Sequence, residues 1–237
     1  MRNHSKNLHI LFEDAHIIVC EKPHGLATQS RRIGSPDMEN LIKRHLYEEF
    51  SGNDGQKEPY LAVIHRPDQP VRGILVFAKT PAAARELNRE LQNGDFGKYY
   101  LALTSHTPAE ASGTLEHYLY KDSKTNTASI CTPEKKGAKR ARLSYEVCNS
   151  LIDFYKNVAP DFKSDSGDMA LLKVHLDTGR FHQIRCQLSA IGCPIVGDTK
   201  YNPTCQNTKG WQTLCLCAYR LEFLHPVTHK KMTFSLI

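Results

Sequence analysis

Apolar residues alternate or cluster along much of the chain in patterns that predict β-strands. Residues 8–21 are predicted to form a hairpin. Apolar and polar residues alternate up to Phe12, a polar turn follows, and the apolar run Ile17-Ile-Val-Cys20 returns. Lys22-Pro-His-Gly25 then interrupts the strand, which is typical of a loop first and of the edge of a site second. Later apolar runs predict strands at 60–64, 74–77, 98–103, 142–148 and 170–176, and a short helix or strand from Trp211 into a closing hairpin.

Helical spacing of apolar residues predicts two helices in the first part of the chain. One begins near Ser35-Pro-Asp37 and repeats apolar residues between Leu41 and Phe50 on one face. The other has Thr80 as its N-cap, Pro81 in its first turn and Gly94 after its last turn. The arrangement of cap, proline and glycine makes this the most securely bounded helix of the sequence.

A third helix is predicted after the turn at residues 177–180. Ile184, Leu188 and Ile191 repeat on the face that we expect to be buried, while Arg185 lies on another face. Residues 153–168 are expected to form an irregular, hydrophilic connection. Because no internal repeat and no clean linker divides the sequence, we expect a single domain over residues 1–237.

Composition and charge narrow the function only slightly. The chain has 237 residues, 40% hydrophobic and 24% charged, so a globular fold with a substantial core is expected. A net charge of +6 favours a polyanionic partner but does not require one. Neither a membrane-spanning run nor a secretory signal is present, so we expect a cytoplasmic protein whose eight cysteines are reduced thiols.

Residues 121–142 form a strongly basic segment. Seven lysines and arginines stand there against Asp122 and Glu134 alone. Such a segment is either a solvated hairpin or, if other features indicate a nucleic acid, an arm that contacts phosphates.

The most unusual polar segment is the turn within residues 64–80. It contains a single acid, Asp68, among His65, Arg66 and Arg72. Two prolines restrict the backbone around Asp68 to extended or turn geometry, and Gly73 permits close approach. The alternative is an ordinary hairpin corner in which the aspartate only caps a turn. A carboxylate among cationic groups should remain an anion, which suits a nucleophile or a base rather than an acid.

Other chemistries have weaker support. The C-terminal cysteines and histidines lack the paired spacing of a structural zinc site, and Cys215-Leu-Cys217 alternates as core residues do. Cys20, Cys148 and Cys186 lie beside apolar neighbours and are expected to be inert and buried. No phosphate-binding loop, dinucleotide fingerprint or serine-hydrolase elbow is present. Asp198 is the one candidate for a second acid, and a turn role suits it better.

Four segments of the chain, taken in order, contain recognisable motifs. The segment His65-Arg-Pro-Asp68, followed by Gly73-Ile-Leu-Val-Phe-Ala-Lys79, resembles the His-Arg-Leu-Asp…Gly-Leu-Leu-Leu-Phe-Ala-Lys motif of the RluA-type RNA pseudouridine synthases. Lys98-Tyr-Tyr-Leu-Ala102 resembles the family's Lys-x-Tyr-x-Ala strand. Thr178-Gly-Arg-Phe-His-Gln-Ile-Arg185 and Pro194-Ile-Val-Gly-Asp-Thr-Lys-Tyr201 resemble its other two motifs. The opening segment through Gly25 and the closing His225-Pro226 also fit, so the resemblance covers nearly the whole chain.

The resemblance implies an α+β fold with a mixed, largely antiparallel central sheet, flanking helices and a basic cleft. It implies that Asp68 is the catalytic aspartate, that Tyr100 stacks on the target uracil, and that Arg185 pairs with Asp68. The alternation of side chains along a strand agrees that only one of Tyr99 and Tyr100 faces a site beside Asp68. The resemblance also implies that Arg66 helps to flip the base out of the RNA stack. The remaining RNA-binding candidates are His65, Lys79, Arg180, His182 and Gln183.

The expected function is isomerisation of uridine to pseudouridine in structured rRNA or tRNA, by a monomer with no cofactor and no metal. Asp68 would attack C1′ or take the 2′ proton, and both routes stay open. Pro67 replaces the family's usual leucine and Cys217 stands where a histidine is common. The altered turn leaves a catalytically idle RNA-binding protein as the alternative, with a zinc-dependent enzyme as a third. We also expect the catalytic domain to lack the S4 domain that many relatives carry.

Overall fold

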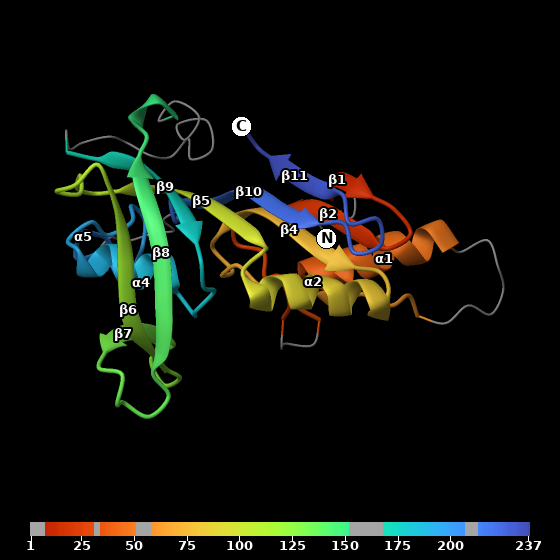
Figure 1. Cartoon of the computed structure of the whole chain (residues 1–237), viewed down its shortest axis with the longest axis horizontal. Helices are drawn as coiled ribbons and strands as arrows, with labels where there is room; N and C mark the ends of the chain where they lie inside the picture. The colour runs from red at the N-terminus through yellow and green to blue at the C-terminus, as the bar shows by residue number, and fades with distance from the viewer. Residues whose placement is uncertain (1–7, 31–33, 51–57, 152–167, 207–212) are drawn as a thin grey trace. The chain divides into compact units, whose positions relative to one another are not determined.

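The computed structural model describes residues 8–30, 34–50, 58–151, 168–206 and 213–237 (Figure 1). The chain divides into two compact units. Unit 1 comprises Met1–Phe96 and Arg220–Leu236, and unit 2 comprises Gly97–Tyr219 with Ile237. The expectation of a single catalytic domain over the whole chain stays a prediction.

Unit 1 contains an antiparallel sheet that begins with the predicted hairpin. Strand β2 pairs with β1 on one side and with β4 on the other, and β11 pairs with β10. The short β3 pairs with the end of β4. The strands are β1 (His9–Glu13), β2 (Ile17–Lys22), β3 (Ala62–Val63), β4 (Arg72–Ala78), β11 (Lys231–Ser235) and the last residues of β10 (Leu216–Leu224).

The sheet of unit 1 is buried on both faces because its central strands are apolar at nearly every position. In β2, Ile17 and Val19 belong to one core, which includes Leu87 of helix α2 (Pro81–Asn93). The alternate residues, Ile18 and Cys20, belong to a second core that contains Met38 and Ile42 of helix α1 (Met38–Phe50). Since successive side chains of a strand point to opposite faces, α1 and α2 cover opposite sides of the sheet.

Helix α2 has both of the caps that its sequence predicts. The Thr80 hydroxyl accepts a hydrogen bond from the Ala83 amide at 3.2 Å, which satisfies one of the free donors of the first turn. Gly94 adopts a left-handed conformation with φ of 88° and donates its N–H to the Glu90 carbonyl. The predicted boundaries of this helix are confirmed.

Unit 2 is built on antiparallel hairpins. Strand β9 pairs with β5 and β8, and β6 pairs with β7 and β8 (Figure 1). Helix α4 (Gln183–Ala190) packs on the β6–β8 part of this sheet through Cys186, which joins Leu119, Ala128 and Ala141 in a small core. The strands are β5 (Gly97–Thr104), β6 (Ser112–Asp122), β7 (Thr127–Cys131), β8 (Lys139–Val147), β9 (Ala170–Leu176) and the first residues of β10. The 3₁₀ turn η2 (Asn149–Leu151) follows β8, and the short helix α5 (Pro203–Gln206) lies between α4 and β10. The expected fold class, helices packed on a largely antiparallel sheet, is confirmed.

Two expectations about the elements and their residues are corrected, for the strand at 60–64 and for Cys148. The strand expected at 60–64 is limited to Ala62–Val63, because it pairs only with the end of β4 and then enters the turn at Asp68. Cys148 follows β8 and is only partly buried, unlike Cys20 and Cys186. All eight cysteines are free thiols, as expected. The connection expected at 153–168 lies almost wholly outside the described residues, and so does Trp211.

None of the described helices has both the length and the apolar character that crossing a membrane requires.

Candidate active site

Asp68 lies in a turn of unit 1 whose backbone is held from outside. The Val71 amide donates to the Asp68 carbonyl at 2.9 Å, which closes the turn. The end of β2 and the loop after it supply donors to the neighbouring carbonyls: the Lys22 ammonium to Gln69 at 2.8 Å and the Thr28 hydroxyl to Pro67 at 3.3 Å. The Pro70 carbonyl lies 2.9 Å from Nδ1 of His24. Because the prolines of this turn have no N–H, side chains from another segment fix it through its carbonyl oxygens.

Lys22 belongs to this arrangement, and it opens the Lys22-Pro-His-Gly25 segment whose pattern is typical of a loop first and of the edge of a site second. Its side chain is fully buried and also donates to the Leu26 carbonyl at 2.7 Å. Burial lowers its pKa to about 7, and the negative charge of Asp68 partly opposes that shift. The available signal was a lysine at the end of an apolar strand, directly before a proline, in a segment whose pattern is typical of a loop first.

The two residues before Pro67 have different environments. The ring of His65 packs edge-on against Phe96, with 5.5 Å between the ring centroids. Arg66 is exposed, and its Nη1 donates a long hydrogen bond of 3.4 Å to the Gln29 side chain. The structure therefore packs His65 on a core residue of unit 1 and leaves Arg66 exposed, two positions before Asp68 in the turn.

Lys79, a predicted RNA contact, has a partner inside the protein. Its ammonium forms an ion pair with Glu13, which also contacts His45, and the Lys79 side chain is only 13% exposed. Arg72 is similarly paired with Glu21. A phosphate would have to compete with Glu13 for Lys79, so the geometry favours a structural role for this lysine.

In unit 2, the two tyrosines of β5 lie on opposite faces, as their alternation predicts. Tyr100 is 7% exposed and pairs in register with Val174. Tyr99 instead packs on His175 of β9, with ring centroids 4.7 Å apart. Lys98 lies on the same face of the strand as Tyr100 and is also buried.

Arg185 of α4 forms a buried ion pair with Asp198. The guanidinium donates through Nε and Nη2 to the two carboxylate oxygens at 2.8 and 2.7 Å. The Asp198 side chain also accepts from the amides of Lys200 and Tyr201. Its predicted turn role is thus confirmed, whereas the ion pair was not foreseen. The pairing of Arg185 with Asp68 stays a prediction.

The turn before α4 is organised by Gln183. Its side-chain oxygen accepts from the Thr178 hydroxyl at 2.7 Å and the Arg180 amide at 2.9 Å, and its nitrogen donates to the Arg142 carbonyl. Gln183 is 2% exposed, so these contacts favour a positioning role over direct RNA contact. The turn leaves Arg180 at the surface of unit 2.

His182 is a second buried member of this turn. It has a left-handed backbone with φ of 50°, and its Nδ1 lies 2.8 Å from the Tyr201 hydroxyl. Its ring stacks on Phe181 with centroids 3.8 Å apart. Burial, and then the charges of Arg185, Lys200 and Lys121, lower its pKa to about 3. His182 is therefore a neutral ring at physiological pH.

The predicted site residues are divided between the two units. Asp68, His65, Arg66 and Lys79 belong to unit 1, whereas Tyr100 and the Arg180–Arg185 segment belong to unit 2. Within the described part of the chain, no three or more His, Cys, Asp or Glu side chains gather as metal ligands would. Cys215 and Cys217 are buried, which confirms their interpretation as core residues.

Comparison with known proteins agrees with the four motifs. A family model described as RNA pseudouridylate synthase matches residues 16–190, a span that contains every predicted site residue. An RNA pseudouridine synthase of Helicobacter pylori is 29% identical over 96% of this chain, which spans 65% of that relative's length. The ribosomal large subunit pseudouridine synthase D of Zymomonas mobilis is 28% identical over 96% of this chain and 68% of its own.

Two solved human structures share the fold. RNA Pseudouridylate Synthase Domain Containing 4 has a TM-score of 0.69 at 20% identity, covering 97% of this chain and 88% of that protein. RNA Pseudouridylate Synthase Domain Containing 1 has a TM-score of 0.68 at 21% identity, covering 100% and 86%. At these identities the likeness concerns the fold alone. The family match over residues 16–190 is what establishes that the chain belongs to the RNA pseudouridylate synthase family.

Proposed function

We propose that this protein isomerises uridine to pseudouridine in RNA, with Asp68 as the catalytic carboxylate. The observation that carries the proposal is the fixed turn at Asp68. Donors from Thr28 and Lys22 hold the carbonyls on either side of it, within a chain whose family is established. Such an arrangement holds the backbone of the turn that carries the Asp68 carboxylate before substrate binds, and a pre-organised backbone is what a nucleophile or base requires.

The reaction makes limited demands on the protein. The bond between ribose C1′ and uracil N1 breaks, the base rotates, and a bond forms between C1′ and C5. N1 then gains a proton and C5 loses one, so no co-reactant is consumed. In our proposal the Asp68 carboxylate either attacks C1′ or removes the 2′ proton, and the protein has to hold the detached base until it rejoins.

Four other predicted residues receive roles in this proposal. Arg66, exposed next to Pro67 and Asp68, is proposed to help extrude the uridine from the RNA stack. Tyr100 is proposed to stack on the uracil. Arg185 is proposed to orient Asp68, with its guanidinium held in place by Asp198. Arg180 is proposed to contact phosphate.

Structured ribosomal or transfer RNA is the proposed substrate class. Support comes from the net charge of +6 and from the relative in Zymomonas mobilis, whose name refers to the ribosomal large subunit. Comparing pseudouridine maps of a deletion strain and its parent would identify the RNA and the position. The monomeric state and the cytoplasmic location stay predictions.

The decisive test compares the protein with its Asp68→Asn variant. Each is incubated with total cellular RNA, and pseudouridine is mapped by carbodiimide-stop sequencing. We expect new pseudouridine from the parent protein and a rate lower by more than about a thousandfold for Asp68→Asn, because the amide can neither attack nor accept the proton.

Two controls make this result interpretable. Asp68→Asn has nearly the same shape, so its thermal midpoint and RNA affinity should match those of the parent. Equal product from Asp68→Asn would refute the assignment of the carboxylate. RNA binding without product from any RNA would instead favour the catalytically idle alternative.

A further inference from the structure

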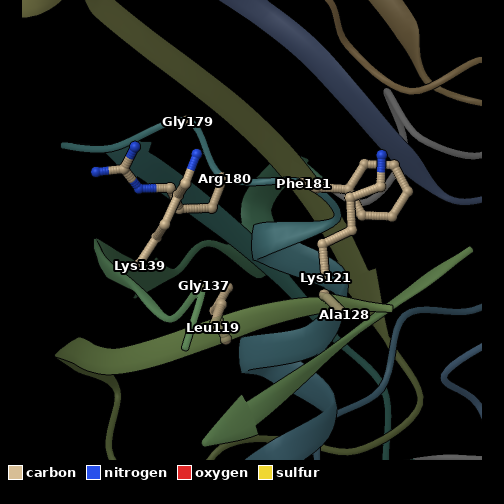
Figure 2. A pocket seen from close by; sticks show the side chains of 8 residues that line it. All are labelled: Leu119, Lys121, Ala128, Gly137, Lys139, Gly179, Arg180 and Phe181. Carbon is tan, nitrogen blue, oxygen red and sulfur yellow. The ribbon is translucent and has the colours of Figure 1, made fainter. Parts of the chain in front are cut away.

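Unit 2 contains a recess whose chemistry is not explained by the catalytic residues. It lies between the β6–β8 hairpins and the turn before α4 (Figure 2). Its floor includes the buried side chains of Leu119 and Ala128, which belong to the small core beneath α4. Among the described residues that line it, three are cationic and none is a carboxylate. The residues that line it are Leu119, Lys121, Ala128, Gly137, Lys139, Gly179, Arg180 and Phe181.

The cations occupy two ends of the recess. Figure 2 shows Lys139 and Arg180 extending side by side at one end and Lys121 next to Phe181 at the other. The Lys121 ammonium lies 4.1 Å from the centroid of the Phe181 ring. Arg180 donates through Nε to the Arg140 carbonyl at 2.8 Å, which fixes the plane of its guanidinium. The aromatic ring and this hydrogen bond therefore pre-position two of the three cations.

These cations differ from the neighbouring arginines in lacking counterions. Arg140 is paired with Glu116 at 2.7 Å, and Arg142 with Asp177 at 3.3 Å. Within the described part of the chain, Lys121, Lys139 and Arg180 form no ion pair. The basic segment 121–142 is therefore not uniform, because its arginines are neutralised and its recess lysines are available to an external anion.

A further buried cation increases the positive potential at this turn. Lys98 is 7% exposed, and a Cβ at Gly179 would lie 3.7 Å from its ammonium. Burial, together with the charge of Arg180, lowers the pKa of Lys98. An anion bound over Gly179 would relieve this repulsion, and the absence of a side chain there gives it access to the backbone.

We propose that this recess binds the sugar–phosphate backbone of the substrate RNA outside the target uridine. Two separated cationic ends suit successive phosphates of one strand, and the apolar floor between them suits a sugar. The proposal rests on the proposed function, since it takes RNA as the substrate. Gly179, Arg180 and Phe181, which line the recess, come shortly before α4 in the chain, and α4 carries Arg185. RNA bound in the recess would therefore contact the segment that contributes a proposed catalytic side chain.

The test uses two double variants with the same loss of charge. Lys121→Gln/Lys139→Gln removes the two lysines of the recess. Lys124→Gln/Lys136→Gln removes two exposed lysines from the same hairpin region that do not line it. All four side chains are exposed, so the far-ultraviolet circular dichroism and thermal midpoints should match those of the parent protein.

The probe is a fluorescein-labelled RNA hairpin with uridines in its loop, and its anisotropy is measured over a series of potassium chloride concentrations. Each lost phosphate contact should reduce the slope of log affinity against log salt by about 0.7, so the recess variant should lose about 1.4. The control variant should keep nearly the parent slope. An equal reduction in both variants, or no reduction in either, would overturn the proposal.

Competition distinguishes the possible sources of phosphate. Inorganic phosphate and uridine monophosphate are titrated against the bound hairpin. Neither should displace the hairpin at the concentrations at which unlabelled RNA displaces it. If uridine monophosphate competes as well as RNA with the parent protein but not with the recess variant, the recess is a mononucleotide site and the proposal fails.

Pseudouridine formation in cellular RNA separates this inference from the proposed function. Product from the parent protein together with unchanged binding by the recess variant would refute the recess and leave the enzyme. A recess-dependent salt slope without product from any RNA would refute the enzyme and leave the recess as an RNA-binding surface.

Discussion

The environment of Asp68 depends on residues that precede it by about forty positions. Thr28 and Lys22 donate to carbonyls within the turn, so the end of β2 and the loop after it hold the backbone on both sides of Asp68. Pro67 and Pro70 remove amide donors but leave carbonyl acceptors, and the structure uses those acceptors. The unusual proline before Asp68 is thus compatible with a turn held from outside.

At the same scale, the buried imidazole of His182 should make stability depend on pH. Its pKa is lowered from 6.5 to about 3, so the unfolded chain takes up a proton near pH 6.5 while the folded protein does not. Stability should therefore fall as the pH decreases through this window, by up to about 2 kcal/mol between pH 6.5 and about pH 5.

His182→Asn tests this dependence, because asparagine tolerates the left-handed backbone and does not titrate. Urea unfolding at several pH values should give a variant that is less stable overall but loses less stability on acidification. A variant with the same pH slope as the parent would show that other groups cause it.

Two glycines with similar backbone angles should respond very differently to alanine. Gly94 has φ of 88° and open space where a Cβ would lie, whereas Gly197 has φ of 75° and a Cβ there would lie 2.0 Å from the Thr213 carbonyl oxygen. Gly94→Ala should cost about 1–2 kcal/mol from backbone strain alone. Gly197→Ala adds a steric clash and should cost at least about 3 kcal/mol. Chemical denaturation of both variants measures the difference, and equal losses would contradict the close approach.

At the scale of elements, α4 has no solvent-facing side in its first two turns. Residues Gln183–Leu188 are all buried, including the polar ones. The sequence predicts one apolar face with Arg185 on another, and the structure buries that second face through Asp198. The ion pair therefore connects α4 to the turn at Asp198–Tyr201, and the helix position depends on both partners.

Removing one partner of this pair should be strongly destabilising. Asp198→Asn removes the negative charge that faces the buried guanidinium in this pair and should cost about 3–5 kcal/mol. Glu116→Gln, which breaks the exposed pair with Arg140, should change stability little because solvent screens that pair. Urea unfolding of the two variants provides the comparison. Similar small losses would mean that Asp198 acts only as a turn cap.

At the scale of the whole molecule, individual strands differ in how completely their side chains are buried. In unit 1 the residues Ile17–Cys20 and Leu75–Ala78 are at most 1% exposed, so both faces of β2 and β4 are covered. In unit 2 the residues of β6 alternate between exposed and partly buried positions over much of the strand, and β7 has a single buried residue.

Native-state hydrogen exchange should reflect this difference. The amides of β2 and β4 should exchange slowly, because only extensive unfolding exposes them to solvent. The amides of β6 and β7 should exchange faster, through local unfolding. The measurement is mass spectrometry or NMR of the folded protein in deuterated buffer. Exchange of β7 amides as slow as that of β4 would contradict this expectation.

The sequence by itself determined the elements whose signals are local. Caps at Thr80 and Gly94 bounded α2, and period-two and fully apolar runs located the strands, because hydrogen-bonding and burial patterns repeat within a few residues. Ordered motifs then indicated the family and the candidate residues. Strand 60–64 was overextended because apolar character alone does not reveal where pairing stops.

Only the tertiary structure decided which polar side chains have partners inside the protein. The partners come from different segments of the chain: Lys22 and the Gln69 carbonyl, Arg185 and Asp198, and Lys79 and Glu13. The same applies to the basic segment, in which Glu116 and Asp177 neutralise the arginines and leave Lys121 and Lys139 without an ion pair among the described residues. Charge neutralisation depends on distance in space, which the order of residues does not give.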